Sequence, residues 1–157
     1  MNDFDKLDNI EQKTGKVIEL MKDIELMKDI ELNIDNIILY YINPKELGFT
    51  RNIILHHSKI PMGAKIKILN TICHNIGEQN HFEDLHKLIT IRNVFAHGKP
   101  FEDENMIFKL AELKSDGKIK KSELDKLAED FLRLFNEQNQ KLIQFHGKIK
   151  NQYKKNQ

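Results

Sequence analysis

The chain has 157 residues, of which 39% are hydrophobic and 31% charged, a composition typical of one globular domain and not of a disordered segment. Its 25 basic and 24 acidic residues give a formal net charge of +1, so the overall charge points to no particular partner. The single cysteine, Cys73, excludes an intrachain disulfide and a cysteine-based zinc site. The acidic N-terminus does not resemble a signal peptide, and the longest apolar run, residues 37–42, is far too short to span a membrane. We therefore expect a cytoplasmic protein with no membrane association.

The first predicted element is a long helix, from about residue 5 to residue 42, which ends at Asn43-Pro44. It contains the repeat IELMKD at residues 18–23 and again at 24–29, followed by IELNID at 30–35. Six residues turn a helix by about 240°, so the repeat spreads its apolar residues around the helix. Either a tandem duplication has lengthened a tolerant helix, or this helix packs on several sides against a partner chain.

Two shorter helices are predicted next, after a turn at residues 43–50 and a short apolar piece at 51–58. Pro61 suits the first turn of a helix and Gly77 suits its end. The apolar residues of this helix recur at helical spacing: Ile66, Leu69, Ile72 and Ile76. Asn80 can cap a second helix, over residues 81–97, which Gly98 and Pro100 end. Its apolar residues are Phe82, Leu85, Leu88, Ile89 and Phe95.

The last third of the chain changes pattern. Residues 106–113 and 114–121 predict two short strands around the turn at Asp116-Gly117. Ser122 can cap a final long helix, with Asp125 in its first turn. The apolar residues of this helix are Leu124, Leu127, Phe131, Leu134, Phe135, Leu142, Ile143 and Phe145. The basic tail, about residues 150–157, is expected to fray. The sequence thus predicts a single, mostly helical domain over residues 1–157 with a small β-hairpin insert.

The helix over residues 81–97 ends in three polar residues, within the stretch IRNVFAHG (91–98). On a helical wheel with Arg92 at zero, the predicted apolar residues from Leu85 onward fall within about 60° of it. Asn93 and His97 lie along one edge of this arc, at about 100° and 140°. A charge on a core-facing stripe is costly unless it is paired. Arg92 is therefore expected to need a carboxylate, exposed carbonyls, a partner chain or an anionic ligand.

Two interpretations of these polar residues stay open. In the structural one, Arg92 complements the carbonyl groups at the helix end and His97 is only a C-terminal cap. In the chemical one, a neutral imidazole acts as general acid or base near neutral pH, and a guanidinium clamps a phosphate and stabilises developing charge. His97 would then deprotonate a ribose 2′-hydroxyl or protonate the leaving oxygen, while Arg92 holds the phosphoryl oxygens. That combination is what RNA cleavage without a metal requires.

The segment R-N-V-F-A-H, residues 92–97, resembles the motif of the HEPN superfamily, in which Arg and His are separated by four to six residues and Asn commonly follows the Arg. The stretches SKIPMGAKIKIL (58–69) and FEDLHKLITIRNVFAHG (82–98) are similar to the HEPN-like branch that includes the mannitol operon repressor family. The resemblance covers about residues 60–100 and extends to the long first and last helices. It does not explain the hairpin or the repeat.

This resemblance implies an all-α, up-and-down helical bundle of HEPN type that homodimerises, with the motifs of two subunits meeting at a shared cleft. It makes Arg92 and His97 the catalytic pair and Asn93 the intervening polar residue. Many members of the superfamily are metal-independent ribonucleases, including toxins of toxin–antitoxin pairs and phage-defence proteins. Others are non-catalytic modules that bind RNA or regulate partners.

Other residues of the sequence are also candidates for a functional role. Arg51 and His56 also satisfy the Arg-Asn-x-x-x-His pattern, but residues 92–97 are preferred because they close a long amphipathic helix. Lys65, Lys67 and Lys99 are candidates for contact with an RNA backbone, or else members of an ordinary solvated face. The histidines lack the spacing of metal ligands, so we expect no metal site and no cofactor.

The sequence therefore favours a metal-independent endoribonuclease of HEPN type, a toxin or phage-defence component that cuts RNA at a dimer interface. RNA, a second copy of the chain and a cognate antitoxin protein are the expected partners. The alternative is a non-catalytic HEPN module for RNA binding or regulatory protein interaction.

Overall fold

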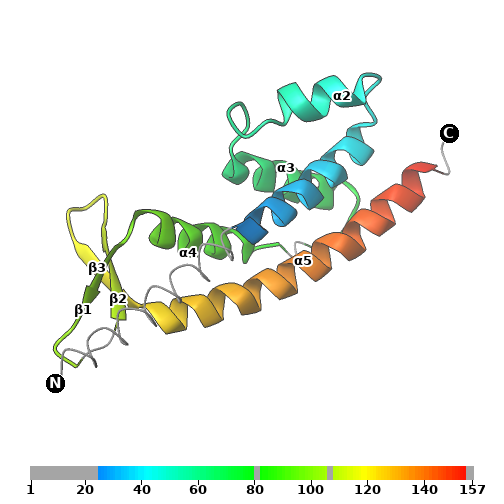
Figure 1. The fold of residues 1–157 in the computed structure, drawn as a ribbon. Coiled ribbons are helices and arrows are strands. Elements are labelled where there is room, and N and C mark those ends of the chain that lie inside the picture. Colours follow the sequence, from blue (N-terminus) through cyan, green and yellow to red (C-terminus); the bar gives the residue numbers. More distant parts are fainter. Residues whose placement is uncertain (1–24, 80–81, 106–107, 155–157) are drawn as a thin grey trace.

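The computed structural model describes residues 25–79, 82–105 and 108–154. Along these residues the chain forms a helix over 25–42, α2 (Leu47–Phe49), a π-helix η1 (Thr50–Ile54), α3 (Met62–Asn75), α4 (Leu85–His97), β1 (Lys99–Glu102), β2 (Phe108–Leu113), β3 (Ile119–Glu123) and α5 (Leu124–Lys154) (Figure 1). Helices predominate, so the predicted mainly-α class is confirmed. In Figure 1 the sheet lies beside the first turns of α5, and α2 lies at the other end of the molecule.

The main core joins helix 25–42, α3, α4 and α5. Helix 25–42 contributes residues spaced three or four apart, which is the spacing of one helix face: Ile30, Ile34, Ile37 and Ile38, all with no exposed surface. Leu32, from the same repeat unit as Ile30, is 52% exposed. The expected spreading of the repeat around the helix is thus confirmed for residues 30–35, while residues 18–24 lie outside the described part of the chain.

Helix α3 begins and ends where its sequence predicts. Pro61 occupies the N-cap position, and Gly77 adopts a φ of +74° just past the helix, a conformation that glycine accepts without strain. Ile66, Leu69 and Ile72 are buried against the main core, as their spacing predicts.

A buried cation ties α3 to helix 25–42. Lys65 is 1% exposed, and its Nζ lies 2.7 Å from Glu31 Oε1 and 2.8 Å from Asp35 Oδ1. The two carboxylates are one helical turn apart, so one ammonium bridges both. Asn33 Nδ2 donates to Asn139 Oδ1 at 2.8 Å, which fixes the same helix against α5.

Three boundaries differ from the prediction. Helix α4 begins at Leu85, after Asp84, and not at residue 81; Asn80, its expected cap, lies outside the described residues. Ser122 does not cap α5 because it pairs with Leu110 within the sheet. The expected fraying from residue 150 is wrong up to Lys154, since α5 continues that far and Ile149 is fully buried. Ile143, expected in the core, is 53% exposed.

The predicted hairpin is two strands of a three-stranded antiparallel sheet in the order β1-β2-β3. Strand β1 was not predicted because Pro100 suggested only a helix stop. Proline is tolerated on an edge strand, and β1 is an edge. The sheet sits on α4 and α5 through Leu110, which is 5% exposed and packs with Val94 and Leu124.

The first prediction concerns Lys65. Lys65→Met keeps most of the side-chain volume but leaves Glu31 and Asp35 without their shared cation, so it should lower the free energy of unfolding by about 3 kcal/mol. The measurement is the urea unfolding midpoint followed by circular dichroism. Lys67→Met, at an exposed position of the same helix, is the matched control and should change stability by less than about 0.5 kcal/mol. Equal effects of the two substitutions would contradict the bridging role.

Candidate functional site

The polar residues of the motif lie at the C-terminal end of α4. Arg92 and His97 are exposed and Asn93 is half-buried. The expectation that Arg92 lies in the middle of the core-facing arc is wrong. Val94, about 200° from Arg92 on the same wheel, is 2% exposed because β2 packs over the last turn of the helix. The buried face of α4 is therefore rotated away from Arg92 at this end.

Arg92 lines a cleft with a volume of about 350 Å³. The cleft lies between the start of helix 25–42, the segment before α3, and α4; its lining residues are Glu25, Met27, Lys28, Glu31, His57, Pro61, Met62, Ile89 and Arg92. Arg92 Nη1 donates to Asn93 Oδ1 at 3.2 Å. The guanidinium pairs with no carboxylate in the described part of the chain, so most of its donors face the cleft and solvent.

The acidic residues of this cleft already have cations. Glu31 is bound to the buried Lys65, and Lys28 Nζ lies 3.6 Å from Glu25 Oε1. These pairs reduce the negative charge near Arg92, which would otherwise repel a phosphate. The cleft thus keeps one guanidinium available for an anionic ligand.

His97 is the last residue of α4 and does not line the Arg92 cleft. Five helical positions separate it from Arg92, which corresponds to about 140° of rotation and 7.5 Å of rise. Its ring has no hydrogen-bond partner among residues 25–79, 82–105 and 108–154. Within one protomer, the structure does not bring the imidazole of His97 and the guanidinium of Arg92 into the same cleft.

His57 is a residue of the cleft that the sequence did not single out. It lines the same cleft as Arg92, and its ring centroid lies 4.2 Å from that of His56. No local pattern marks it, because only the packing of the segment before α3 against α4 brings it near Arg92. His57 is therefore a second imidazole to test at this site.

Of the three lysines predicted to contact RNA, one is buried and two are exposed. Lys65 is wrong as an RNA contact, because its ammonium is buried between two carboxylates. Lys67 and Lys99 are exposed and stay predictions.

Arg51 and His56, the Arg and His of the second copy of the motif, both have hydrogen-bond partners. Arg51, in the π-helix η1, donates through Nη2 to Asn36 Oδ1 at 2.9 Å, and His56 Nδ1 lies 2.9 Å from Ser58 Oγ. Arg51 thus bonds across to helix 25–42, and His56 faces its own turn. Both contacts favour a structural role for this copy.

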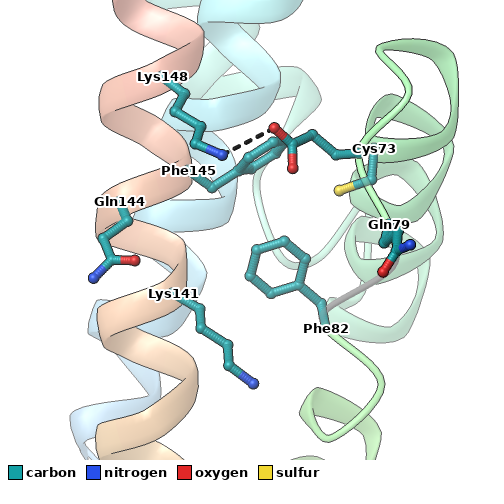
Figure 2. Close-up of a pocket in the computed structure, with 8 residues that line it drawn as sticks. Cys73, Gln79, Phe82, Lys141, Gln144, Phe145 and Lys148 are labelled. Atoms are coloured by element: carbon teal, nitrogen blue, oxygen red, sulfur yellow. Dashed lines mark hydrogen bonds and ion pairs between the residues drawn. The ribbon is translucent and has the colours of Figure 1, made fainter.

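A further cleft of about 290 Å³ lies between the end of α3 and α5 (Figure 2). Phe82 and Phe145 meet there with ring centroids 5.6 Å apart, and Lys148 Nζ bonds Glu78 Oε1 at 3.0 Å. Burial raises the pKa of the Cys73 thiol at this cleft to about 11, so it stays protonated and unreactive near neutral pH. None of the motif residues lines this cleft.

Within the described residues, no group of three His, Cys, Asp or Glu side chains is arranged to hold a metal ion. No described helix has the length and apolar character needed to cross a membrane. The chain matches no protein-family model, no curated protein and no solved structure. Membership of the HEPN superfamily therefore stays a prediction from the resemblance of residues 92–97 and the stretches around them.

The second prediction concerns Gly98, which joins α4 to β1. A Cβ at this position would lie 2.4 Å from the carbonyl oxygen of Val94 and 3.2 Å from Leu110 Cβ. Because the Val94 carbonyl belongs to the last turn of α4, Gly98→Ala must distort the junction between α4 and β1, and it should destabilise the fold by about 1–3 kcal/mol. Thermal unfolding followed by circular dichroism measures the change.

The matched control is Gly63→Ala, in α3, where an added Cβ meets nothing within 4 Å. It should be neutral or stabilise the protein by up to about 1 kcal/mol, because alanine favours the helix. A Gly98→Ala variant as stable as wild type would show that the backbone at this junction does not approach the Val94 carbonyl as described.

Proposed function

We propose that this protein is a metal-independent endoribonuclease of HEPN type, which cuts RNA by attack of the 2′-hydroxyl on the adjacent phosphate. The observation that carries the proposal is the state of Arg92. It is exposed at a cleft, it pairs with no carboxylate in the described residues, and the acids around it are bound to other cations. A guanidinium kept in this state suits a phosphate ligand.

The proposed roles follow from the chemistry of each group. The imidazole of His97 accepts the proton of the 2′-hydroxyl, the 2′ oxygen forms a bond to phosphorus, and the P–O5′ bond breaks. The 5′ oxygen leaves with a proton from the imidazolium or from water. Arg92 stabilises the charge that develops on the phosphoryl oxygens, and the hydrogen bond to Asn93 holds the guanidinium in place.

A homodimer completes this site. His97 lies outside the Arg92 cleft of its own protomer, so the pair can act together if the His97 of a second copy reaches the Arg92 cleft of the first. The resemblance to HEPN proteins implies this arrangement, in which two motifs face one another across a two-fold axis. A toxin or phage-defence component with a cognate antitoxin protein is the biological setting that the resemblance suggests.

One observation favours the second candidate, a non-catalytic HEPN module that binds RNA or a regulatory partner. A catalytic imidazole is usually oriented by a hydrogen bond to its second nitrogen, and His97 has no such partner in the described chain. In this alternative Arg92 still binds an anion but no proton transfer follows.

The third prediction is the cleavage test. Purified protein should cut mixed single-stranded RNA in excess EDTA, leave 2′,3′-cyclic phosphate and 5′-hydroxyl ends, and leave DNA of the same sequence intact. His97→Ala and Arg92→Ala should each lower the rate by at least about 100-fold, the usual contribution of an acid–base group or a charge clamp. Labelled RNA on denaturing gels and end-group analysis provide the measurements.

Three control variants sharpen this test. Arg51→Ala and His56→Ala alter the second copy of the motif and should leave cleavage nearly unchanged. His57→Ala tests whether His57, and not His97, supplies the base that acts beside Arg92. If His57→Ala abolishes cleavage and His97→Ala does not, the base has been misassigned. If no RNA is cut while RNA is still bound, the non-catalytic module is the better description.

The fourth prediction concerns assembly. The protein should sediment as a homodimer at micromolar concentration, because the proposed site needs residues from two copies. Mixing inactive Arg92→Ala and His97→Ala proteins should restore part of the activity, since one of the two sites in the mixed dimer has both groups intact. A clean monomer that cuts RNA would rule out the shared site.

A further inference from the structure

The three-stranded sheet has one face on the protein core and one face turned away from it. Leu110 lies on the inner face, buried against Val94 and Leu124. Side chains alternate along a strand, so the residues paired with or two positions from Ala111 lie on the opposite face. We name this opposite side the outer face of the sheet; the strand register places on it Lys99, Phe101, Lys109, Ala111, Leu113, Ile119, Lys121 and Glu123.

Two lysines and a small residue form the middle of the outer face. Lys99 and Lys121 are both direct partners of Ala111, on either side of it, and both are exposed. Neither lysine has an ion-pair partner in the described part of the chain. Lys109, in contrast, is paired with Asp103 and so fixes the loop after β1. Ala111, between the two lysines, contributes only a methyl group to this part of the outer face.

An aromatic ring lies beside this pair of lysines. Phe101 is half-buried, and Lys121 Nζ lies 5.3 Å from the centre of its ring, so this ammonium covers one ring face and a stacked base would have to take its place. A cleft of about 420 Å³ opens at the same place, lined by Phe101, Asp103, Glu104, Asn105, Lys109 and Lys121. Beyond it, toward the hairpin tip, the paired Leu113 and Ile119 are 72% and 65% exposed.

We propose that the outer face of the sheet binds single-stranded RNA, with a base stacked on Phe101 and the backbone phosphates on Lys99 and Lys121. An aromatic platform flanked by lysines is how proteins hold unpaired bases, because stacking needs a free base face and the cations neutralise the backbone. Polar side chains at the cleft can bond base edges. A duplex hides its base faces and cannot use Phe101.

The outer face of the sheet begins close to the C-terminal end of α4. Strand β1 begins two residues after His97, so RNA held on the outer face passes the end of α4. The surface would deliver an unpaired segment to the candidate pair, and in this sense the inference rests on the proposed function. It adds to that function the substrate class and the residues that select it.

The fifth prediction tests this surface by fluorescence anisotropy with a labelled 12-nucleotide oligouridine, using proteins that carry His97→Ala so that the RNA stays intact. Phe101→Ala should raise Kd by about 5- to 100-fold, the range expected for the loss of one stacked base. Lys121→Ala should weaken binding and lower the slope of log Kd against log salt concentration by about one, which corresponds to one fewer released counterion. The matched control is Lys120→Ala, which alters the adjacent exposed lysine on the opposite side of the strand and should change Kd by less than about twofold.

A duplex RNA of equal length should compete poorly, and circular dichroism melts should show that the variants are folded. Kd values unchanged in both Phe101→Ala and Lys121→Ala, equal effects of Lys120→Ala and Lys121→Ala, or no binding of the oligouridine would each overturn the inference.

Failure of the surface can be told apart from failure of the proposed function. If the protein with an intact His97 cuts RNA and Phe101→Ala leaves KM unchanged, the endoribonuclease proposal is supported and the proposed binding surface is wrong. If Phe101→Ala weakens RNA binding but the protein with His97 intact cuts nothing, the surface stands and the endoribonuclease proposal falls.

Discussion

The ammonium of Lys65 sets the relation between α3 and helix 25–42, and the Arg92 cleft depends on that relation. Glu31 belongs to both features, since it bonds Lys65 and lines the cleft. With Lys65 in place, Glu31 has a closer cation than Arg92, and the guanidinium stays available. The arrangement has a cost, because burial raises the pKa of the Asp35 carboxyl above its ordinary value even though Lys65 acts against that shift. A hydrophobic residue at position 65 would leave the Asp35 carboxyl buried without its cation and would release Glu31 toward Arg92.

Local patterns in the sequence predict much of the fold. Pro61 and Gly77 bound α3, and the apolar spacing of Ile30, Ile34 and Ile38 identifies the buried face of the first described helix, because these signals depend on backbone conformation and helical period alone. Lys65 could not be predicted in the same way. On a helix it looks like any solvated lysine, and its partners lie 34 and 30 residues away in the sequence.

At the candidate site, too, local patterns could be predicted from the sequence and tertiary packing could not. The spacing of Arg92 and His97 at a helix end could be recognised in the sequence, but the exposure of Arg92 could not. The wheel treated α4 as if one neighbour covered its whole length. In the structure the main core covers Leu85 and Leu88, whereas Leu110 of the sheet covers Val94, so the buried face changes direction along the helix. Strand β1 was missed because Pro100 suggested only a helix stop, whereas Arg92 was misplaced because a wheel cannot show that Leu110 packs on Val94. His57 was missed for a different reason, since only tertiary packing brings it to the cleft.

Helix α4 connects the Arg92 cleft with the sheet. One side of its C-terminal half faces the cleft that holds Arg92, and its end leads through Gly98 directly into the sheet that carries Lys99 and Phe101. Gly98 lets the chain pass close to the carbonyl oxygen of Val94, where a Cβ would lie only 2.4 Å from that oxygen, and Leu110 of the sheet packs on Val94, so the position of the sheet relative to His97 is set by packing. A fixed sheet matters for the proposed chemistry, because in-line attack by a 2′-hydroxyl needs the phosphate held within a fraction of an ångström of its reacting position. Under the proposed function, the β insert, which the resemblance to HEPN proteins does not explain, would be the part of the molecule that chooses which RNA reaches the helix end.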